Sequence, residues 1–251
     1  MQDLLTTLSH FPPISLEEMD HVQLLNRIDT KFVIHENQLK EFLSAIETYY
    51  NILVINDVSL HPYETLYFDT PGLKLYHMHH NGKLNRYKLR CRKYVNSGVS
   101  FFEIKTKTNT SRTIKKRMAI DCIPETLDAP MNQYIREHTP GKLAHYVPVL
   151  RVYFDRITLV NKKANERLTF DINLRYKSSG SEVKIQDLVI VEIKQEKCSV
   201  SPFRQLMKEH RHPINYLSKY CLGLTCLNSG LKKNRFKHKI DTLNKLGYGI
   251  H

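Results

Sequence analysis

The chain has 251 residues, of which 41% are hydrophobic, and this apolar content is enough for one large domain with a buried core. Lys and Arg number 38 against 25 Asp and Glu, and the formal charge of +13 favours a polyanionic partner such as phosphate, nucleotide, nucleic acid or anionic lipid. The composition excludes a disordered chain, and no apolar run reaches the length of a transmembrane helix.

The first residues and the cysteines indicate the compartment. Residues 1–20 carry acids and no basic segment ahead of an apolar stretch, so they are not a secretory signal. The 5 cysteines include no C-x-x-C pair, and their odd number argues against a disulfide scaffold. We therefore expect a reduced, cytoplasmic protein.

The predicted elements begin with a short helix. Ser15 and Glu18 have the S-x-x-E spacing of a capping box, which predicts a helix start. A strand is expected over 27–34, and an amphipathic helix over 36–49 follows it. The apolar side chains of that helix recur at helical spacing, which predicts packing on a sheet; they are Leu39, Phe42, Leu43 and Ile46.

The middle of the chain consists of short alternating segments separated by Gly, Asn and Pro. This pattern predicts antiparallel strands over 63–69, 85–94, 99–107 and 112–121. A helical turn that ends near Gly82 is expected between the first two strands. Residues beyond this hairpin region, from 125 to 146, are expected to be mostly helical.

Three more strands are predicted in the last part of the chain, over 149–160, 166–176 and 187–195. Helical segments over 201–211 and 213–224 follow them. We predict one domain over residues 1–228, with an N-terminal helix, and a basic C-terminal tail over residues 229–251. The tail is interpreted as a solvated extension, with contact to anionic lipid or another polyanion as the alternative.

Charged residues alternate with apolar residues in five of the predicted strands. Because successive side chains of a strand point to opposite faces, equal spacing by two places the charged residues on one face. In residues 86–92 the charged face holds Arg86, Lys88, Arg90 and Arg92, opposite Tyr87, Leu89 and Cys91. The other charged sets are Glu103, Lys105 and Lys107; Lys115 and Arg117; Arg167, Asp171 and Arg175; and Glu192 and Lys194.

Two explanations fit this alternation. A solvated sheet face gives the same pattern and is the simpler reading of any single strand. However, cations two residues apart lie about 7 Å from each other and repel by about 2 kcal/mol at an effective dielectric of about 20. An inward face that binds a chain of phosphates removes this repulsion, and the acids Glu103, Asp171 and Glu192 could hold a divalent cation there.

A set of short motifs, in the same order, resembles the catalytic domain of the vacuolar transporter chaperone (VTC) polyphosphate polymerases. These proteins are a branch of the triphosphate tunnel metalloenzymes, also called CYTH-like proteins. The matching motifs span residues 27–220: RIDTKF (27–32), YFDT (67–70), LRCRKY (89–94), FEIKTK (102–107), IKKR (114–117), FDR (154–156), RLTFD (167–171), VEIK (191–194) and LSKY (217–220).

The resemblance implies an α+β fold, in which an antiparallel eight-stranded β tunnel has helices packed outside. It implies a lumen that holds triphosphate or polyphosphate with Mn2+ or Mg2+. The implied activity is transfer of the γ-phosphate of ATP to a growing polyphosphate chain. Partners would be ATP and inorganic polyphosphate, with a membrane or transporter partner on other chains. A nucleic-acid partner is not expected, because no aromatic stacking motif is interleaved with the cations.

The resemblance also assigns roles to residues. The catalytic phosphate ligands would be Lys31, Arg90, Arg92, Lys105, Lys115, Arg156, Arg167 and Lys219. Further substrate-binding residues would be Lys88, Arg117, Lys194 and Ser218. The metal ligands would be Glu192 first, then Glu103 and Asp171, with Glu103 alternatively pairing with the cations around it.

The sequence departs from the tunnel pattern at two places. Tunnel hydrolases begin with E-x-E-x-K, whereas this chain has Arg27, Asp29 and Lys31 at these positions, which favours the polymerase branch. Phe154 stands where the family often has an aromatic residue with a hydroxyl group. A tunnel phosphohydrolase acting on tripolyphosphate or nucleoside triphosphates, and a non-catalytic polyanion-binding module, remain open as alternatives.

One histidine cluster needs a separate interpretation. His77, His79 and His80 in the sequence HMHH have no carboxylate or cysteine partner nearby in the sequence. A polar surface at a helix end is therefore expected rather than a metal site.

Overall fold

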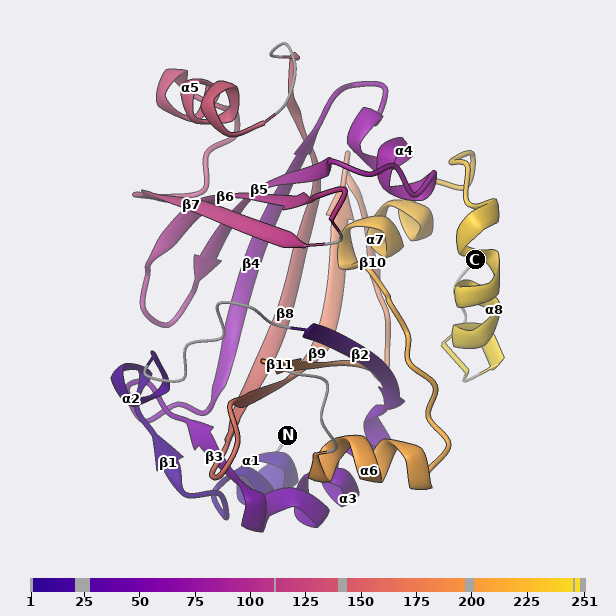
Figure 1. The fold of residues 1–251 in the computed structure, drawn as a ribbon. Helices are drawn as coiled ribbons and strands as arrows, with labels where there is room; N and C mark the ends of the chain where they lie inside the picture. The colour runs from indigo at the N-terminus through magenta and orange to yellow at the C-terminus, as the bar shows by residue number, and fades with distance from the viewer. Residues whose placement is uncertain are drawn as a thin grey trace. The chain divides into compact units, whose positions relative to one another are not determined.

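The structure, a computed structural model, describes residues 2–20, 28–110, 112–139, 144–196, 201–245 and 247–248 (Figure 1). The strands are β1 (Pro13–Ile14), β2 (Ile28–His35), β3 (Tyr50–Leu53), β4 (Leu60–Asp69), β5 (Arg86–Tyr94), β6 (Ser100–Lys107), β7 (Thr113–Ile120), β8 (Val147–Asn161), β9 (Glu166–Ser178), β10 (Ser181–Lys184) and β11 (Leu188–Gln195). The helices are α1 (Gln2–Leu8), α2 (Leu16–Asp20), α3 (Glu36–Ile46), α4 (Lys74–His80), α5 (Ala129–His138), α6 (Pro202–Glu209), α7 (Lys219–Leu227) and α8 (Lys237–Lys245), with short 3-10 turns at Glu47–Tyr49 and Asn234–Phe236.

All of these strands belong to one sheet. Its main path has the order β2-β11-β9-β8-β4-β5-β6-β7, and β1, β3 and β10 pair beside this path. Neighbouring strands pair in antiparallel register, apart from the parallel pair of β1 and β3. Within the described residues the path is open, because β2 and β7 end it without pairing to each other. The predicted α+β class, an antiparallel sheet with helices, is confirmed.

The chain forms two compact units, and strands β4, β8 and β9 contribute residues to both. The first unit contains residues 1–62, 154–174 and 185–217, and the second contains residues 63–153, 175–184 and 218–251. The predicted domain over residues 1–228 and tail over residues 229–251 stay predictions.

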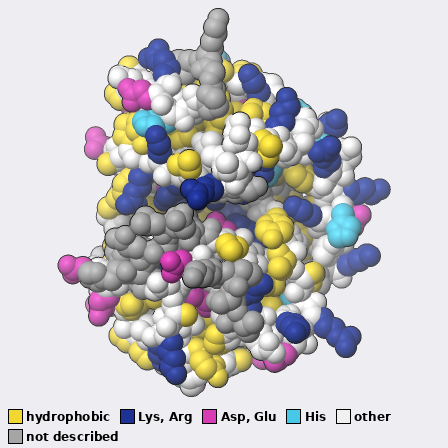
Figure 2. All heavy atoms as spheres, viewed as in Figure 1, with side chains coloured by type: hydrophobic (Ala, Val, Ile, Leu, Met, Phe, Trp, Pro, Cys, Tyr) yellow, Lys and Arg dark blue, Asp and Glu magenta, His cyan; other side chains and the backbone are white. Residues whose placement is uncertain are grey.

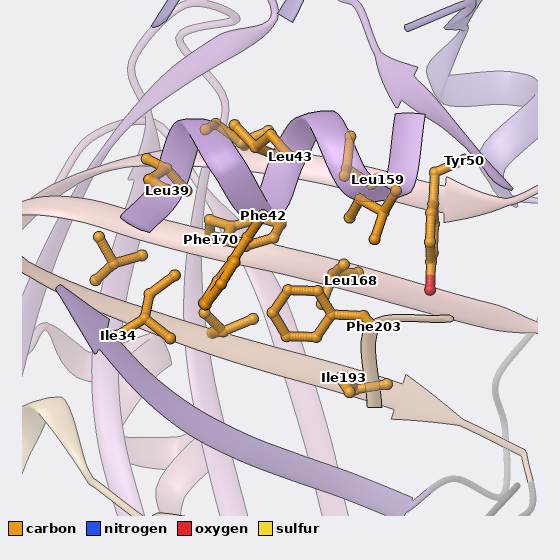
Figure 3. Packing of buried hydrophobic residues seen from close by; sticks show 14 of the residues in the cluster. Ile34, Leu39, Phe42, Leu43, Tyr50, Leu159, Leu168, Phe170, Ile193 and Phe203 are labelled. Carbon is orange, nitrogen blue, oxygen red and sulfur yellow. The ribbon is translucent and has the colours of Figure 1, made fainter. Parts of the chain in front are cut away.

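The core of the first unit lies where helices α3 and α6 cover the apolar face of β2, β9 and β11 (Figure 3). Phe42 of α3 and Phe203 of α6 are fully buried there, beside Phe170 of β9. The stripe expected from the helical spacing of residues 36–49 is confirmed, since the buried side chains of α3 are Leu39, Phe42, Leu43 and Ile46. One face of these strands is thus committed to the core, and the other is left for polar side chains.

The second unit has the same organisation around β4, β5 and β6. Leu89 of β5 and Phe102 of β6 are fully buried, with Leu75 of α4 and both Met131 and Ile135 of α5 packed against the same apolar face. The parity predicted for these two strands is confirmed, because the apolar residues enter the core and the charged residues occupy the opposite face.

The helix expected over 125–146 is shorter than predicted. Helix α5 begins after Asp128, whose carboxylate accepts the backbone N–H of Met131 at 2.8 Å, and it ends at His138. Asp128 caps the N-terminus of the helix and so fixes its start. Pro140 follows the last turn in the sequence and disfavours further helix, so the helix is limited at both ends. No helix of the described residues combines the length and apolar character needed to cross a bilayer.

The capping box predicted at residue 15 is confirmed. The backbone N–H of Ser15 donates to the Glu18 carboxylate at 2.8 Å, and the N–H of Glu18 donates to Ser15 Oγ at 3.2 Å. Helix α2 starts there; residues 21–27 lie outside the described residues, as does Cys198. The described cysteines, Cys91, Cys122, Cys221 and Cys226, are free thiols.

Candidate functional site

The polar face of the second unit carries rows of charged residues that run across β4 to β7. Strand register places Tyr67, Arg90, Glu103 and Arg117 in one row and Lys88, Lys105 and Lys115 in the next. The rows are set by pairing between hairpin strands, so the alternation within each strand becomes a two-dimensional array of cations. This array is the second-unit cluster.

Glu103 is the one carboxylate in these two rows, and it is fully buried. Its Oε2 accepts from Arg90 Nε and Nη2, each at 2.6 Å, and its Oε1 lies 3.1 Å from Lys115 Nζ. Burial alone would raise the pKa of Glu103, but the positive charges of Arg90, Arg92 and Lys115 outweigh it and hold the pKa far below its ordinary value. Glu103 is therefore a counter-ion for the cations, as the second of its two predicted roles states.

This arrangement predicts loss of stability in acid. A carboxylate whose pKa is lowered by folding stabilises the folded state above its unfolded pKa, near 4.5, and this contribution disappears as the pH falls toward the folded pKa. We expect the free energy of unfolding, measured with urea, to fall more steeply below about pH 4.5 in the unaltered protein than in Glu103→Gln. Equal slopes in the two proteins would contradict this explanation.

The remaining arginines of this face do not contact the carboxylate directly. Arg92 is 9% exposed, its Nε donates to Thr65 Oγ1 at 3.3 Å, and its guanidinium lies over the Tyr63 ring. Arg117 is exposed and stacks on the Phe101 ring with 4.6 Å to the centroid. Arg117, predicted to bind substrate, thus lies at the solvent-exposed margin of the cluster.

Ser218, at the start of helix α7, lies on the same face, and Lys219 is the first residue of that helix. Ser218 is its N-cap, accepting the N–H of Cys221 at 3.4 Å, and the same Oγ accepts from Lys88 Nζ at 2.8 Å. The helix is anchored by Tyr220, whose hydroxyl donates to the buried carboxylate of Asp69. Ser218, predicted as a substrate-binding hydroxyl, thus lies beside Lys88, and its role in binding stays a prediction.

The first unit carries a separate group of charged residues on β2, β9 and β11, here called the first-unit cluster. Register sets Lys31 opposite Glu192 and Lys194 opposite Arg167. Glu192 lies between two ammonium groups, with Oε1 at 3.1 Å from Lys31 Nζ and Oε2 at 3.5 Å from Lys194 Nζ. Burial would lower the pKa of Lys31, but the Glu192 carboxylate raises it overall, so this lysine is charged.

Arg156 and Asp171 form a bidentate pair in the same unit. Arg156 Nε donates to Oδ1 at 2.6 Å and Nη2 donates to Oδ2 at 2.8 Å, and the side chain of Asp171 is only 1% exposed. Arg167 donates from Nη2 to the backbone carbonyl of Met19 at 3.3 Å. Both oxygens of Asp171 are therefore committed to the guanidinium.

Comparison with known proteins identifies the family. A family profile described as the VTC domain matches residues 26–228. The chain belongs to the VTC domain family. The resemblance to the VTC domain seen in the motifs is confirmed. No curated protein matches the chain significantly.

Several solved structures are similar to this VTC domain at low identity. A conserved hypothetical protein from Pyrococcus furiosus has 14% identity and a TM-score of 0.44, covering 78% of this chain and 99% of its own. A Bacillus halodurans protein has 12% identity and a TM-score of 0.46, covering 77% and 96%. A Hippeastrum protein, whose title reports a dominant triphosphatase activity, has 12% identity and a TM-score of 0.45, covering 79% and 96%. Similarity at this level does not assign an activity to this chain.

A metal ion would find few ligands in this VTC domain. Within the described residues, no group of three or more His, Cys, Asp and Glu side chains is placed to hold a metal. All three acids contact cations through both oxygens, and Glu192 has the most exposed side chain of the three, at 11%. One carboxylate with phosphate oxygens of the substrate is a usual arrangement for Mg2+. The residues present fit a metal held mostly by substrate oxygens.

Three residues of the VTC domain's second unit join the cluster without having been predicted as site residues. Tyr67 and Thr65 of β4 share the polar face with Arg90 and Arg92, and Asp69 anchors α7. Arg90, together with Arg92 and Lys88, lowers the pKa of Tyr67 although burial acts in the opposite direction. The alternation of polar and apolar residues along β4 could have predicted that Thr65 and Tyr67 share a face. No local pattern predicts the role of Asp69.

The positive charge is also visible on the surface. Figure 2 shows Lys and Arg side chains in dark blue on the part of the visible face where helix α8 lies. This helix lies beyond the residues matched by the family profile.

Proposed function

We propose that this VTC domain is a polyphosphate polymerase that transfers the γ-phosphate of ATP to a polyphosphate chain. The observation that supports the proposal is the array of Arg and Lys side chains in successive rows of β5, β6 and β7, backed by an apolar core. Rows of cations suit a ligand with a negative charge at every repeat, which a linear phosphate chain provides.

The side chains of the two clusters would act by positioning and by charge stabilisation. Arg90 presents a guanidinium oriented by Glu103, and Arg156 presents one oriented by Asp171, so both are fixed before a substrate arrives. Fixed donors aimed at phosphoryl oxygens stabilise the charge that is distributed over them in the transition state. The acceptor is a terminal phosphate oxygen, which is already anionic, and no protein nucleophile is required.

A divalent cation, when bound, supplies further charge neutralisation between phosphate oxygens. Glu192 would hold it, and Lys31 and Lys194 would orient the Glu192 carboxylate. Glu103 and Asp171 would serve as counter-ions of the arginines.

The test follows chain length and free orthophosphate together, after purified protein is incubated with ATP, a short polyphosphate primer and Mn2+ or Mg2+. We expect metal-dependent growth of the primer on gels. Lys31→Met and Lys115→Met should each reduce the initial rate by about tenfold or more, because a charged hydrogen bond contributes roughly 1.5–3 kcal/mol. Glu192→Gln should reduce it and also weaken the dependence on metal concentration.

Strand β7 offers a matched control. Lys116 neighbours Lys115 but pairs in register with Ile104, on the opposite side of the strand, so Lys116→Met should leave the rate unchanged. Release of orthophosphate without primer growth would replace the polymerase by a tunnel phosphohydrolase. Tight, salt-sensitive binding without turnover with either metal would identify a polyanion-binding module.

A further inference from the structure

The C-terminal segment of the second unit is folded against helix α4. The backbone N–H of Arg235 donates to His80 Nε2 at 3.3 Å, and Arg235 Nη1 donates to the carbonyl of Asn81 at 2.8 Å. The Phe236 ring packs on the ring of His80 with centroids 5.1 Å apart and on that of His79 at 6.3 Å. HMHH is therefore not a polar helix-end surface, because two of its histidines pack against this segment.

Helix α8 continues from this contact and turns a lysine inward. Ile240 and Leu243 are its buried residues. Lys239 lies one turn after Phe236 and one turn before Leu243, so it shares the packed side of the helix. Lys245, at the end of the same helix, is exposed.

Lys239 joins a group of nitrogen-bearing side chains from α4 and β5. Burial, with the nearby charges of Lys88, Arg86 and Lys239, lowers the pKa of His79 to about 2, so this imidazole is neutral. Cys221 of α7, next to the Ser218 N-cap that holds Lys88, also lies within reach of the Lys239 charge. Three elements thus bring nitrogen-bearing groups close together: α4 with His79, β5 with Arg86 and Lys88, and α8 with Lys239.

Two nitrogen atoms of this group lack a partner in the part of the chain that the structure describes. They are His79 Nδ1 and Arg86 Nε, both buried. Buried polar atoms are rarely left unsatisfied, and each one carries a free-energy cost. A neutral imidazole can donate one N–H, and Arg86 Nε is a permanent donor, so an anion with several acceptor oxygens would satisfy both.

We propose that His79, Arg86, Lys88 and Lys239 form a subsite for phosphoryl groups of a long polyphosphate chain, continuing the line of cations that runs along β5 from Arg90. The proposal rests on the proposed function, since it assumes that the second-unit cluster binds phosphate. Arg86 and Lys88 extend the same face of β5 from Arg90, at about 7 Å per two residues, so one linear polyanion can follow them. Helix α8 thereby contributes to the binding of long chains.

Isothermal titration calorimetry with tripolyphosphate, ATP and long-chain polyphosphate tests the subsite. Lys239→Met should weaken the binding of long-chain polyphosphate about tenfold and leave that of tripolyphosphate and ATP within about twofold. The slope of log affinity against log salt for the long chain should fall by roughly 0.7. His79→Leu should act in the same direction, and Lys239→Arg should restore binding.

The controls separate the subsite from the proposed function. Lys245→Met removes the same charge from the exposed end of α8 and should change nothing. Long-chain binding that is unaffected by both Lys239→Met and His79→Leu overturns the subsite and leaves the proposed function standing. Equal weakening of the binding of all three ligands also overturns the subsite, because Lys239 would then contribute to binding at the second-unit cluster itself. Failure of the unaltered protein to bind any of the three overturns the proposed function and the subsite together.

Discussion

Arg90→Met is expected to lower the free energy of unfolding by about 3–5 kcal/mol, because it leaves a buried carboxylate without its main partner. Glu103 is fully buried and receives two of its three close contacts from Arg90. Lys115 remains as a partner, but its side chain is 34% exposed and its charge is partly screened by solvent. Urea unfolding at neutral pH measures the loss, and phosphate binding should be lost with it.

A second substitution shows whether the loss of stability comes from the unpaired charge of the buried Glu103 carboxylate. The double variant Arg90→Met, Glu103→Leu should regain much of the stability, since a well-packed apolar pair can replace a buried ion pair. Phosphate binding should stay lost, because the guanidinium is still absent. Arg117→Met, which alters an exposed cation of the same row, should change stability by less than about 0.5 kcal/mol. A single variant as stable as the unaltered protein would contradict the role assigned to Glu103.

Gly223→Ala is expected to destabilise the second unit by about 2 kcal/mol, although alanine is the better helix former by about 1 kcal/mol. An added Cβ would lie 2.8 Å from Tyr176 Cε1 and 2.9 Å from Leu150 Cδ2, and closer still to Tyr176 Cδ1. Both neighbours are buried, so neither side chain has space to move away. Helix α7 would have to shift, which would displace Lys219 and the Ser218 N-cap; thermal unfolding and polyphosphate binding measure the two effects.

Gly72→Ala is the matched control for this substitution. A Cβ at Gly72 meets nothing within 4 Å, and its backbone does not have a positive φ. The stability of Gly72→Ala should therefore equal or exceed that of the unaltered protein. A Gly223→Ala variant with unchanged stability and binding would mean that α7 can move outward without cost.

The faces of the strands could be predicted from the sequence because side-chain direction in a strand depends only on parity. The spacing alone predicts Leu89 on the apolar face of its strand, and it predicts Arg90 and Glu103 on the charged face. The ion pairs could not be predicted in the same way, because each joins residues from different strands. The contacts of Glu192 with Lys31, for example, depend on the register of two strands that are far apart in the sequence.

The C-terminal segment shows where sequence reasoning was insufficient. Lys and Arg dominate residues 229–251, and a solvated tail was the expected interpretation. The stripe of Ile240 and Leu243 is too short to indicate a packed helix by periodicity. The packing of the C-terminal segment is instead explained by its contacts with the end of α4. His80 and the C-cap residue Asn81 accept hydrogen bonds from Arg235 there. These contacts join residues that are far apart in the sequence, so no local pattern predicts them.

Strand β7 ends the hydrogen-bonded path of the sheet within the described residues, and its basic side chains have a consequence for handling the protein. An open strand edge can pair with the edge of another molecule, and Lys and Arg along it oppose such pairing by repulsion. Lys115, Lys116 and Arg117 supply this protection beside the exposed Ile114. Neutralising all three together would be expected to cause aggregation, so charge variants of this strand are best made one at a time.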